Sequence, residues 1–165
     1  FADFGDLSAT TGGPAGLSSP TRGLYIGGYT PSADNKIDYI TIASTGNATD
    51  FGNSTTATVY AAGAASETRG LRLAGVNGTN VIDYVTIAST GDATDFGDLQ
   101  TAKSVMAATS NNVRAYFGGG YTDAAIAESD FVTIATTGNG ADFGDLKQAG
   151  EYYYAVSDSH GDLQH

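Results

Sequence analysis

The chain contains no cysteine and only seven lysine and arginine residues among its 165. The lack of cysteine excludes disulfide bonds, a thiolate nucleophile and cysteine-ligated zinc. Asp and Glu number 18, so the net charge is −11. Because nucleic acids and anionic membranes attract clusters of cations, we expect neither as a partner. No apolar run approaches the roughly 18 residues of a membrane-spanning helix.

Glycine is abundant, with 23 residues, while charged residues make up 15% of the chain and hydrophobic residues 41%. This balance is too apolar for a disordered chain. Abundant glycine together with 10% aromatic residues is typical of short β-strands joined by tight turns. The length is that of one domain. Methionine occurs only at Met106, so we expect the chain to be a processed product or a fragment.

Three sequence markers recur in the same order along the chain. The triplet Asp-Phe-Gly recurs at spacings of 47, 45 and 47 residues, and an arginine follows it 19 residues later in three copies. All of the variation in spacing lies in one connection between predicted strands, which indicates a loop between regions of fixed packing. The markers begin at Asp3, Asp50, Asp95 and Asp142 for the triplet, at Arg22, Arg69 and Arg114 for the arginine, and at Asp38, Asp83 and Asp130 for an Asp-aromatic-(Val/Ile)-Thr-Ile-Ala segment.

The markers divide a single repeat domain, residues 1–165, into units that each predict four short antiparallel strands and almost no helix. The pair Asn77-Gly78 is typical of a hairpin turn, so the second and third strands of a unit are predicted to be neighbours. The units are a partial blade at 1–21, repeats at 22–68, 69–113 and 114–159, and a partial repeat at 160–165. The predicted strands are 3–7; 15–19, 23–29, 37–43 and a short strand at Phe51; 62–66, 70–76, 82–88 and a short strand at Phe96; 107–110, 115–121, 130–135 and a short strand at Phe143; and 153–157.

The third strand of each unit is apolar on both faces, which predicts that both faces are covered. Stacked blades of a β-propeller have this property, and small residues in the first strand suit the centre where blades converge. We expect Phe51, Phe96 and Phe143 to be buried between blades. A β-solenoid or a sandwich is the alternative fold. The inventory falls short of the roughly four to eight blades of a closed propeller, so we expect other copies of the chain, or further chain of the same protein, to complete the ring.

One repeat resembles a blade of the kelch family. The resemblance lies in Arg22-Gly-Leu-Tyr-Ile-Gly-Gly-Tyr29, then Ile37-Asp-Tyr-Ile-Thr-Ile, then Asp50-Phe51. The repeated arginine is not a standard kelch element, and phenylalanine stands where the kelch family has tryptophan. The positions that match the family are Gly27-Gly28 and Gly119-Gly120 for its glycine pair, and Tyr39 and Tyr84 for its tyrosine.

The repeats are also similar to kelch-like arrays in virion structural proteins of marine phages, particularly cyanophages. Those arrays look like TRGLYIGGYT and IDYITIASTGNATDFGDL, and they often end in a Ser-x-x-His-Gly phrase like that at 157–161. The resemblance covers nearly the whole chain. It implies an all-β fold of kelch-like propeller blades in an incomplete ring. It also implies a non-enzymatic structural or host-adhesion module of a tail fibre or another appendage, located extracellularly on the virion surface.

Asp92, Asp95 and Asp98 are the candidate metal ligands, because calcium prefers several hard oxygen ligands. The equivalent positions in the other copies carry fewer carboxylates. Asp and Asn also favour turns by bonding to their own backbone, so a purely structural turn is the competing interpretation. A calcium-assisted, lectin-like propeller is therefore the alternative function, with tyrosines available to stack on sugars.

The connections of variable length, at 30–36, 77–80 and 122–128, are expected to face a host glycan, a host protein or a neighbouring subunit. The repeated arginines are expected to be structural and to pair with a nearby aspartate. No catalytic residue is predicted, because both histidines lie in the last six residues, and no enzymatic activity is expected. The candidate ligand or partner residues are Tyr29, Asp34, Asn35, Lys36, Asn77, Asn80, Tyr121, Asp123 and Glu128.

Overall fold

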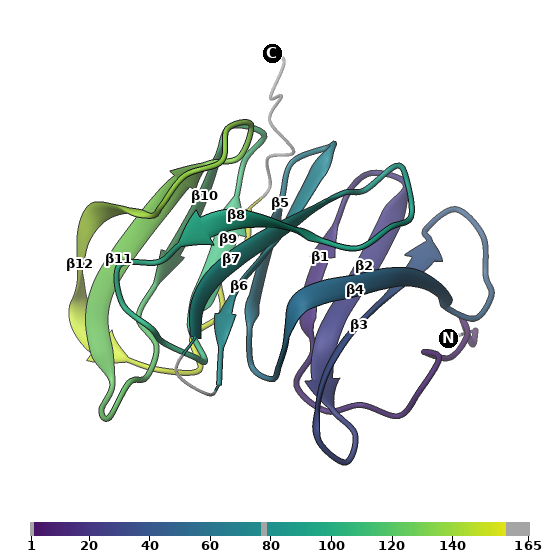
Figure 1. Ribbon diagram of the computed structural model, residues 1–165, viewed down its shortest axis with the longest axis horizontal. Helices are drawn as coiled ribbons and strands as arrows, with labels where there is room; N and C mark the ends of the chain where they lie inside the picture. The colour runs from purple at the N-terminus through teal and green to yellow at the C-terminus, as the bar shows by residue number, and fades with distance from the viewer. Residues whose placement is uncertain (1, 77–78, 158–165) are drawn as a thin grey trace.

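The computed structural model describes residues 2–76 and 79–157, which form three four-stranded antiparallel β-sheets (Figure 1). These residues contain no helix, and hence none long and apolar enough to cross a membrane. The all-β fold expected from the sequence is confirmed. The strands are β1 (Ala15–Ser18), β2 (Arg22–Tyr29), β3 (Ala33–Thr41), β4 (Thr49–Thr58), β5 (Ala62–Ala65), β6 (Arg69–Gly75), β7 (Thr79–Thr86), β8 (Thr94–Asp98), β9 (Ala107–Ser110), β10 (Arg114–Gly118), β11 (Ile126–Thr133) and β12 (Ala141–Gly150).

Each sheet is a meander in which the four strands follow one another in chain order. The second and third strands are antiparallel neighbours in every sheet, as predicted. They pair in the same register, because each repeated arginine at the start of the second strand lies opposite a threonine that ends the third. These pairs are Arg22↔Thr41, Arg69↔Thr86 and Arg114↔Thr133.

The three sheets stand side by side in a blade-like arrangement, and the described residues do not close a ring (Figure 1). Both β1 and β9 contact β5, where small side chains such as those of Ala62 and Ala64 allow the sheets to converge. Each gap between neighbouring sheets holds its own apolar core. The first core includes Leu24, Ile26, Ile37, Phe51, Val85 and Ile87, and the second includes Leu71, Leu73, Ile82, Phe96, Phe117, Val132 and Ile134.

The phenylalanine of the triplet is buried in the first two sheets and exposed in the third. Phe51 and Phe96 are 3% and 2% exposed, whereas Phe143 is 59% exposed. The expectation of burial between blades is confirmed for the first two and wrong for Phe143. Phe51 and Phe96 belong to cores that include residues of the next sheet, and no further sheet follows β12 within the described residues.

The segments on either side of the three sheets are not strands, contrary to the predictions for 3–7 and 153–157. Neither segment forms a continuous ladder of backbone hydrogen bonds with a strand of the described residues. Residues 2–8 nevertheless run along the first sheet, where Gly46 N donates to Phe4 O at 2.7 Å and Ala48 N donates to Asp6 O at 2.8 Å. The partial repeat predicted at 160–165 lies outside the described residues.

Candidate functional site

The connections between the second and third strands lie at one end of the sheets and are held by backbone hydrogen bonds. Tyr29 N donates to Gly12 O at 2.8 Å, and Tyr121 N donates to Ser104 O at 2.9 Å. In the middle sheet Val76 N donates to Val59 O at 2.9 Å. Each connection is thereby tied to the segment that enters its own sheet. The frame that carries these connections is the same in all three sheets, although their lengths differ.

A pair of residues with positive φ shapes the start of each connection. In the third sheet these are Gly119 and Gly120, at φ 67° and 112°. A Cβ atom on Gly120 would lie 2.8 Å from Ser104 O, so the close backbone approach also requires glycine there. The middle sheet instead places Ala74 at φ 49° before Gly75. This geometry is the reason for the glycine pair that the sequence shows at the end of the second strand.

The first two connections, 30–32 and 76–78, are shorter than the sequence predicted, whereas the third, 119–125, is as long as predicted but begins earlier. β3 begins at Ala33, β7 at Thr79 and β11 at Ile126. Besides Tyr29, which ends β2, five candidate ligand residues lie in strands, because the third strand of each sheet begins earlier than expected. Those five are Asp34, Asn35, Lys36, Asn80 and Glu128. Asn77 lies outside the described residues.

Several of these strand residues are engaged within the protein. Asn35 Nδ2 donates to Ser54 O at 3.2 Å, and Asn80 Nδ2 donates to Leu99 O at 3.3 Å. The Asp34 carboxylate accepts the backbone N–H groups of the next two residues. The candidates that project to solvent are Tyr29, Tyr121 and Asp123.

A hollow of about 190 Å³ lies between the β6–β7 and β10–β11 connections. Its lining includes Val76, Lys103, Tyr121 and Thr122. Tyr121 is 40% exposed, and Tyr29, at the equivalent position of the first sheet, is 59% exposed. Tyrosine side chains at such positions offer an apolar ring with a hydroxyl group for binding.

A buried carboxylate occupies the same position of the third strand in every sheet. Asp38, Asp83 and Asp130 are 7%, 1% and 0% exposed. A buried charge is costly without an opposite charge and hydrogen bonds. In the first sheet Ser8 Oγ donates to Asp38 Oδ2 at 2.6 Å, and Lys36 Nζ lies 3.7 Å from Asp38 Oδ1.

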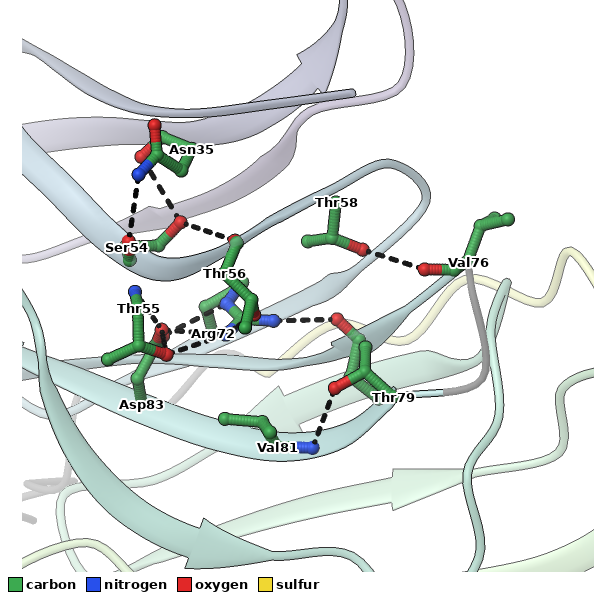
Figure 2. A network of polar contacts seen from close by, with 11 residues as sticks. Asn35, Ser54, Thr55, Thr56, Thr58, Arg72, Val76, Thr79, Val81 and Asp83 are labelled. Carbon is green, nitrogen blue, oxygen red and sulfur yellow. Dashed lines mark hydrogen bonds and ion pairs between the residues drawn. The ribbon is translucent and has the colours of Figure 1, made fainter. Parts of the chain in front are cut away.

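In the middle sheet the cation is an arginine that is itself fully buried (Figure 2). Arg72 Nη2 lies 2.6 Å from Asp83 Oδ2, and Arg72 Nε donates to Asp83 Oδ1 at 2.9 Å. Thr55 contributes both its backbone N–H and its hydroxyl group to Asp83 Oδ2, at 2.8 and 2.7 Å. Thr56 Oγ1 accepts a third guanidinium hydrogen bond. The Arg72–Asp83 pair thus joins β6 and β7 to the β4 strand of the preceding sheet.

In the third sheet the cation is Lys103, which comes from the segment before β9 and is 2% exposed. Its Nζ donates to Asp130 Oδ2 at 2.9 Å and to Glu128 Oε1 at 3.1 Å. Burial raises the pKa of Asp130 and outweighs the effect of Lys103. Burial also opposes ionisation of Glu128, but hydrogen bonds from Thr101 and Lys103 outweigh it and hold the pKa of Glu128 below its usual range.

The repeated arginines join neighbouring sheets. Each guanidinium group lies over an aromatic ring of its own sheet. In two sheets it also donates to a backbone carbonyl of the next sheet, from Arg22 Nη1 to Ile87 O at 2.7 Å and from Arg69 Nη1 to Ile134 O at 3.0 Å. Among the described residues, the expected aspartate partner is wrong for Arg22 and Arg69, because the ring and the carbonyl group hold the guanidinium group. The ring contacts are Arg22–Tyr39 and Arg69–Tyr84, at 4.5 Å each, and Arg114–Phe131, at 4.6 Å.

Of the aspartates proposed as calcium ligands, Asp92 contacts the preceding sheet through its carboxylate and Asp98 contacts the next sheet through its backbone. Asp92 Oδ1 accepts hydrogen bonds from the backbone N and the Nδ2 of Asn53, at 2.9 and 3.2 Å. Asp98 N donates to Asn139 Oδ1 at 3.0 Å, and Asp95 lies in β8 opposite Asp83. Within residues 2–76 and 79–157, no group of three or more acidic, histidine or cysteine side chains is placed to hold a metal ion. Asp95 and Asp98 lie in β8, so the interpretation as a structural turn does not describe these two residues.

Comparison of the chain with known proteins finds no family model that matches it and no curated protein that matches it.

Proposed function

We propose that the chain is a non-enzymatic structural or host-adhesion module of a virion surface appendage such as a tail fibre. The observation that carries this proposal is a fixed frame with connections at one end, of which the one in the third sheet, at 119–125, is longer than those at 30–32 and 76–78. The exposed rings of Tyr29 and Tyr121 project from equivalent positions of that frame. Rigid scaffolds that carry variable loops are a common basis for recognition.

The blades of this module are proposed to be kelch-like. In support, the glycine pair at the end of the second strand has the positive φ values that favour glycine in the first and third sheets. The third-strand tyrosines contact the triplet phenylalanines edge-on, with Tyr39–Phe51 and Tyr84–Phe96 centroids 5.8 and 6.0 Å apart. The sequence resemblance to arrays in marine phages supplies the proposed location on the virion surface.

The buried charges support a structural role. Arg72 and Lys103 are 0% and 2% exposed, and each is matched by the carboxylates of its own sheet. Asp130, which has a raised pKa, is 0% exposed and is not among the residues that line the hollow beside Lys103. Perturbed carboxylates mark catalytic sites when they line a cleft, and this one does not. The charges therefore support folding and the contacts between sheets.

The proposed adhesion is tested with fluorescently labelled chain and cultured marine cyanobacterial cells. We expect the wild-type chain to bind, and the double variant Tyr29→Ala/Tyr121→Ala to lose most of that binding. Val113→Ala is the matched control, because Val113 is 59% exposed in the β9–β10 connection, away from the tyrosine-bearing connections. Absence of wild-type binding, or equal binding by the double variant, would count against adhesion through these connections.

A carbohydrate is the second candidate ligand, favoured by Tyr121 beside the 190 Å³ hollow. A glycan array probed with and without a calcium chelator distinguishes the possibilities. Binding that the chelator abolishes would support the calcium-assisted, lectin-like function. Binding that resists the chelator would support carbohydrate recognition without calcium. A blank array would contradict this second candidate.

A further inference from the structure

Among the described residues, the outer face of the third sheet has no neighbouring sheet and is covered only in part, by residues 153–157, which line hollows beside Tyr116 and Phe143. Phe143 is 59% exposed, although Phe51 and Phe96 are 3% and 2% exposed. The neighbouring glycine shows the same difference. A Cβ atom on Gly97 would lie 2.5 Å from Gly138 O of the next sheet, whereas a Cβ atom on Gly144 would meet nothing within 4 Å.

Within residues 2–76 and 79–157, the first sheet has no neighbouring sheet on its opposite face. Ile42 is 43% exposed, whereas Ile87 and Ile134, at the equivalent positions of the other sheets, are 1% exposed. Those two isoleucines also supply the carbonyl groups that accept hydrogen bonds from Arg22 and Arg69. The two surfaces that meet in each contact between neighbouring sheets are therefore both exposed in this chain. One is the Phe143 face of the third sheet, and the other is the Ile42 face of the first sheet.

Residues 2–8 occupy part of the place that a preceding sheet would take. Phe4 O and Asp6 O accept hydrogen bonds from Gly46 N and Ala48 N. In the contact between the first two sheets, Phe51 O and Asn53 O accept the equivalent bonds from Gly91 N and Ala93 N, at 2.7 and 2.8 Å. This segment leaves Ile42 exposed, so it satisfies the backbone of that face without covering its apolar side chain.

We propose that the outer face of the third sheet of one copy, which carries Phe143, binds the face of the first sheet of a second copy that carries Ile42. The contact displaces residues 2–8 of the second copy, and β1 of the second copy takes the place that residues 153–157 of the first copy hold beside β9. Phe143 would then lie against the second copy's Ile42 face, and Arg114 would donate to the carbonyl of Ile42. The occupant is a second copy because that face continues a contact already made twice within the chain. This inference does not rest on the proposed function.

Charge supports the same arrangement. Lys147 is exposed and lies five residues after the aspartate of its triplet, as Ser8 and Thr55 do in their copies. Ser8 Oγ and Thr55 Oγ1 donate to Asp38 and Asp83. Lys147 would therefore face Asp38 of the second copy, whose buried Oδ1 has no hydrogen-bond partner among the described residues.

The contact between copies is more polar than those within the chain. Tyr116 and Ser129 stand where Leu71 and Ile82 are fully buried. Such a composition is typical of an interface between separate molecules. Head-to-tail contacts form rings or filaments. A ring of two copies would hold six sheets, since each copy has three, and this lies within the range of closed propellers.

Cysteine cross-linking tests the arrangement, because the chain has no cysteine of its own. Within the chain, Asn53 contacts Asp92 across the first two sheets, so Asn53→Cys/Asp92→Cys is the internal control. The equivalent pair between copies is Asp145 and Asn47. We expect mild oxidation of an equimolar mixture of Asp145→Cys and Asn47→Cys chains to give mainly the mixed dimer. Adding Phe143→Asp to the first chain is expected to abolish it.

Deletion of residues 1–8 from the Asn47→Cys chain tests the displacement. The deletion removes the competing segment, so we expect a larger cross-linked fraction. The control cross-link between positions 53 and 92 reports whether the shortened chain still folds. Absence of the mixed dimer while the control pair cross-links would overturn the proposal. An unchanged or smaller cross-linked fraction in the folded, shortened chain would overturn the displacement of residues 2–8.

Discussion

Arg72 and Asp83 form a bidentate ion pair between neighbouring strands, with the arginine and the aspartate 0% and 1% exposed. The positions equivalent to Arg72 hold Tyr25 and Phe117, opposite Asp38 and Asp130. Asp38 is approached by Lys36 of its own strand, and Asp130 by Lys103 from the segment before β9. Each of the three sheets thus has one buried carboxylate at the same position. Its cation comes from the third strand in the first sheet, from the second strand in the middle sheet, and from the segment before β9 in the third sheet.

Breaking the middle pair is expected to be strongly destabilising. Arg72→Met leaves Asp83 buried without its cation, so we expect the free energy of unfolding to fall by about 3–5 kcal/mol. The double variant Arg72→Met/Asp83→Asn removes the stranded charge as well and should recover most of that loss. Urea unfolding followed by circular dichroism measures both. An equal fall in the free energy of unfolding in the single and double variants would show that the unpaired charge of Asp83 is not the cause of the destabilisation.

The triplet phenylalanines are expected to differ in their contribution to stability. Phe51→Ala and Phe96→Ala each leave a cavity between two sheets and should cost about 3–5 kcal/mol. Phe143→Ala removes only edge-on contacts, with Tyr116 and Phe131 at 5.1 and 6.0 Å, and should cost less than about 1.5 kcal/mol. Thermal and urea unfolding at low protein concentration test this order. A loss at Phe143 as large as at Phe96 would contradict it.

Gly97 and Gly144 form a matched pair for testing the contact between sheets. Both have positive φ, at 146° and 118°, so alanine strains the backbone at either position by about 1–3 kcal/mol. At Gly97 the new methyl group would also strike Gly138 O. We therefore expect Gly97→Ala to be clearly more destabilising than Gly144→Ala, by the same unfolding measurements. Equal effects would mean that the two sheets are not in close contact at this point.

The acid stability of the chain depends on two carboxyl groups that act in opposite directions. Glu128 has a lowered pKa, so the stability that it contributes is lost as the pH falls through its folded pKa. Asp130 has a raised pKa, so its protonation on acidification favours the folded state. We expect Glu128→Gln to lose less stability than wild type on acidification between about pH 6 and pH 3, and Asp130→Asn to lose more. Unfolding curves measured across that pH interval show whether each variant loses more or less stability than the wild-type chain.

Much of the fold could be predicted from spacing, because a repeated pattern of apolar residues determines which face of each strand is buried. The predicted strand at 107–110 coincides with β9, and each Asp-aromatic segment begins in a third strand and runs two residues past its end. Arg72 could have been noticed as a single charge in the apolar segment of β6. Its partner depends on strand register, and Lys103 reaches Asp130 from a different part of the chain. The exposure of Phe143 depends on what packs against it, which local sequence does not describe.

The mass of the chain in solution tests the proposed contact between copies most directly. Size-exclusion chromatography with light scattering at micromolar concentrations should give a mass above the 16.7 kDa of one chain. That mass should rise with protein concentration, and Phe143→Asp should return it to one chain. A wild-type mass of 16.7 kDa at every concentration would contradict the proposed head-to-tail assembly.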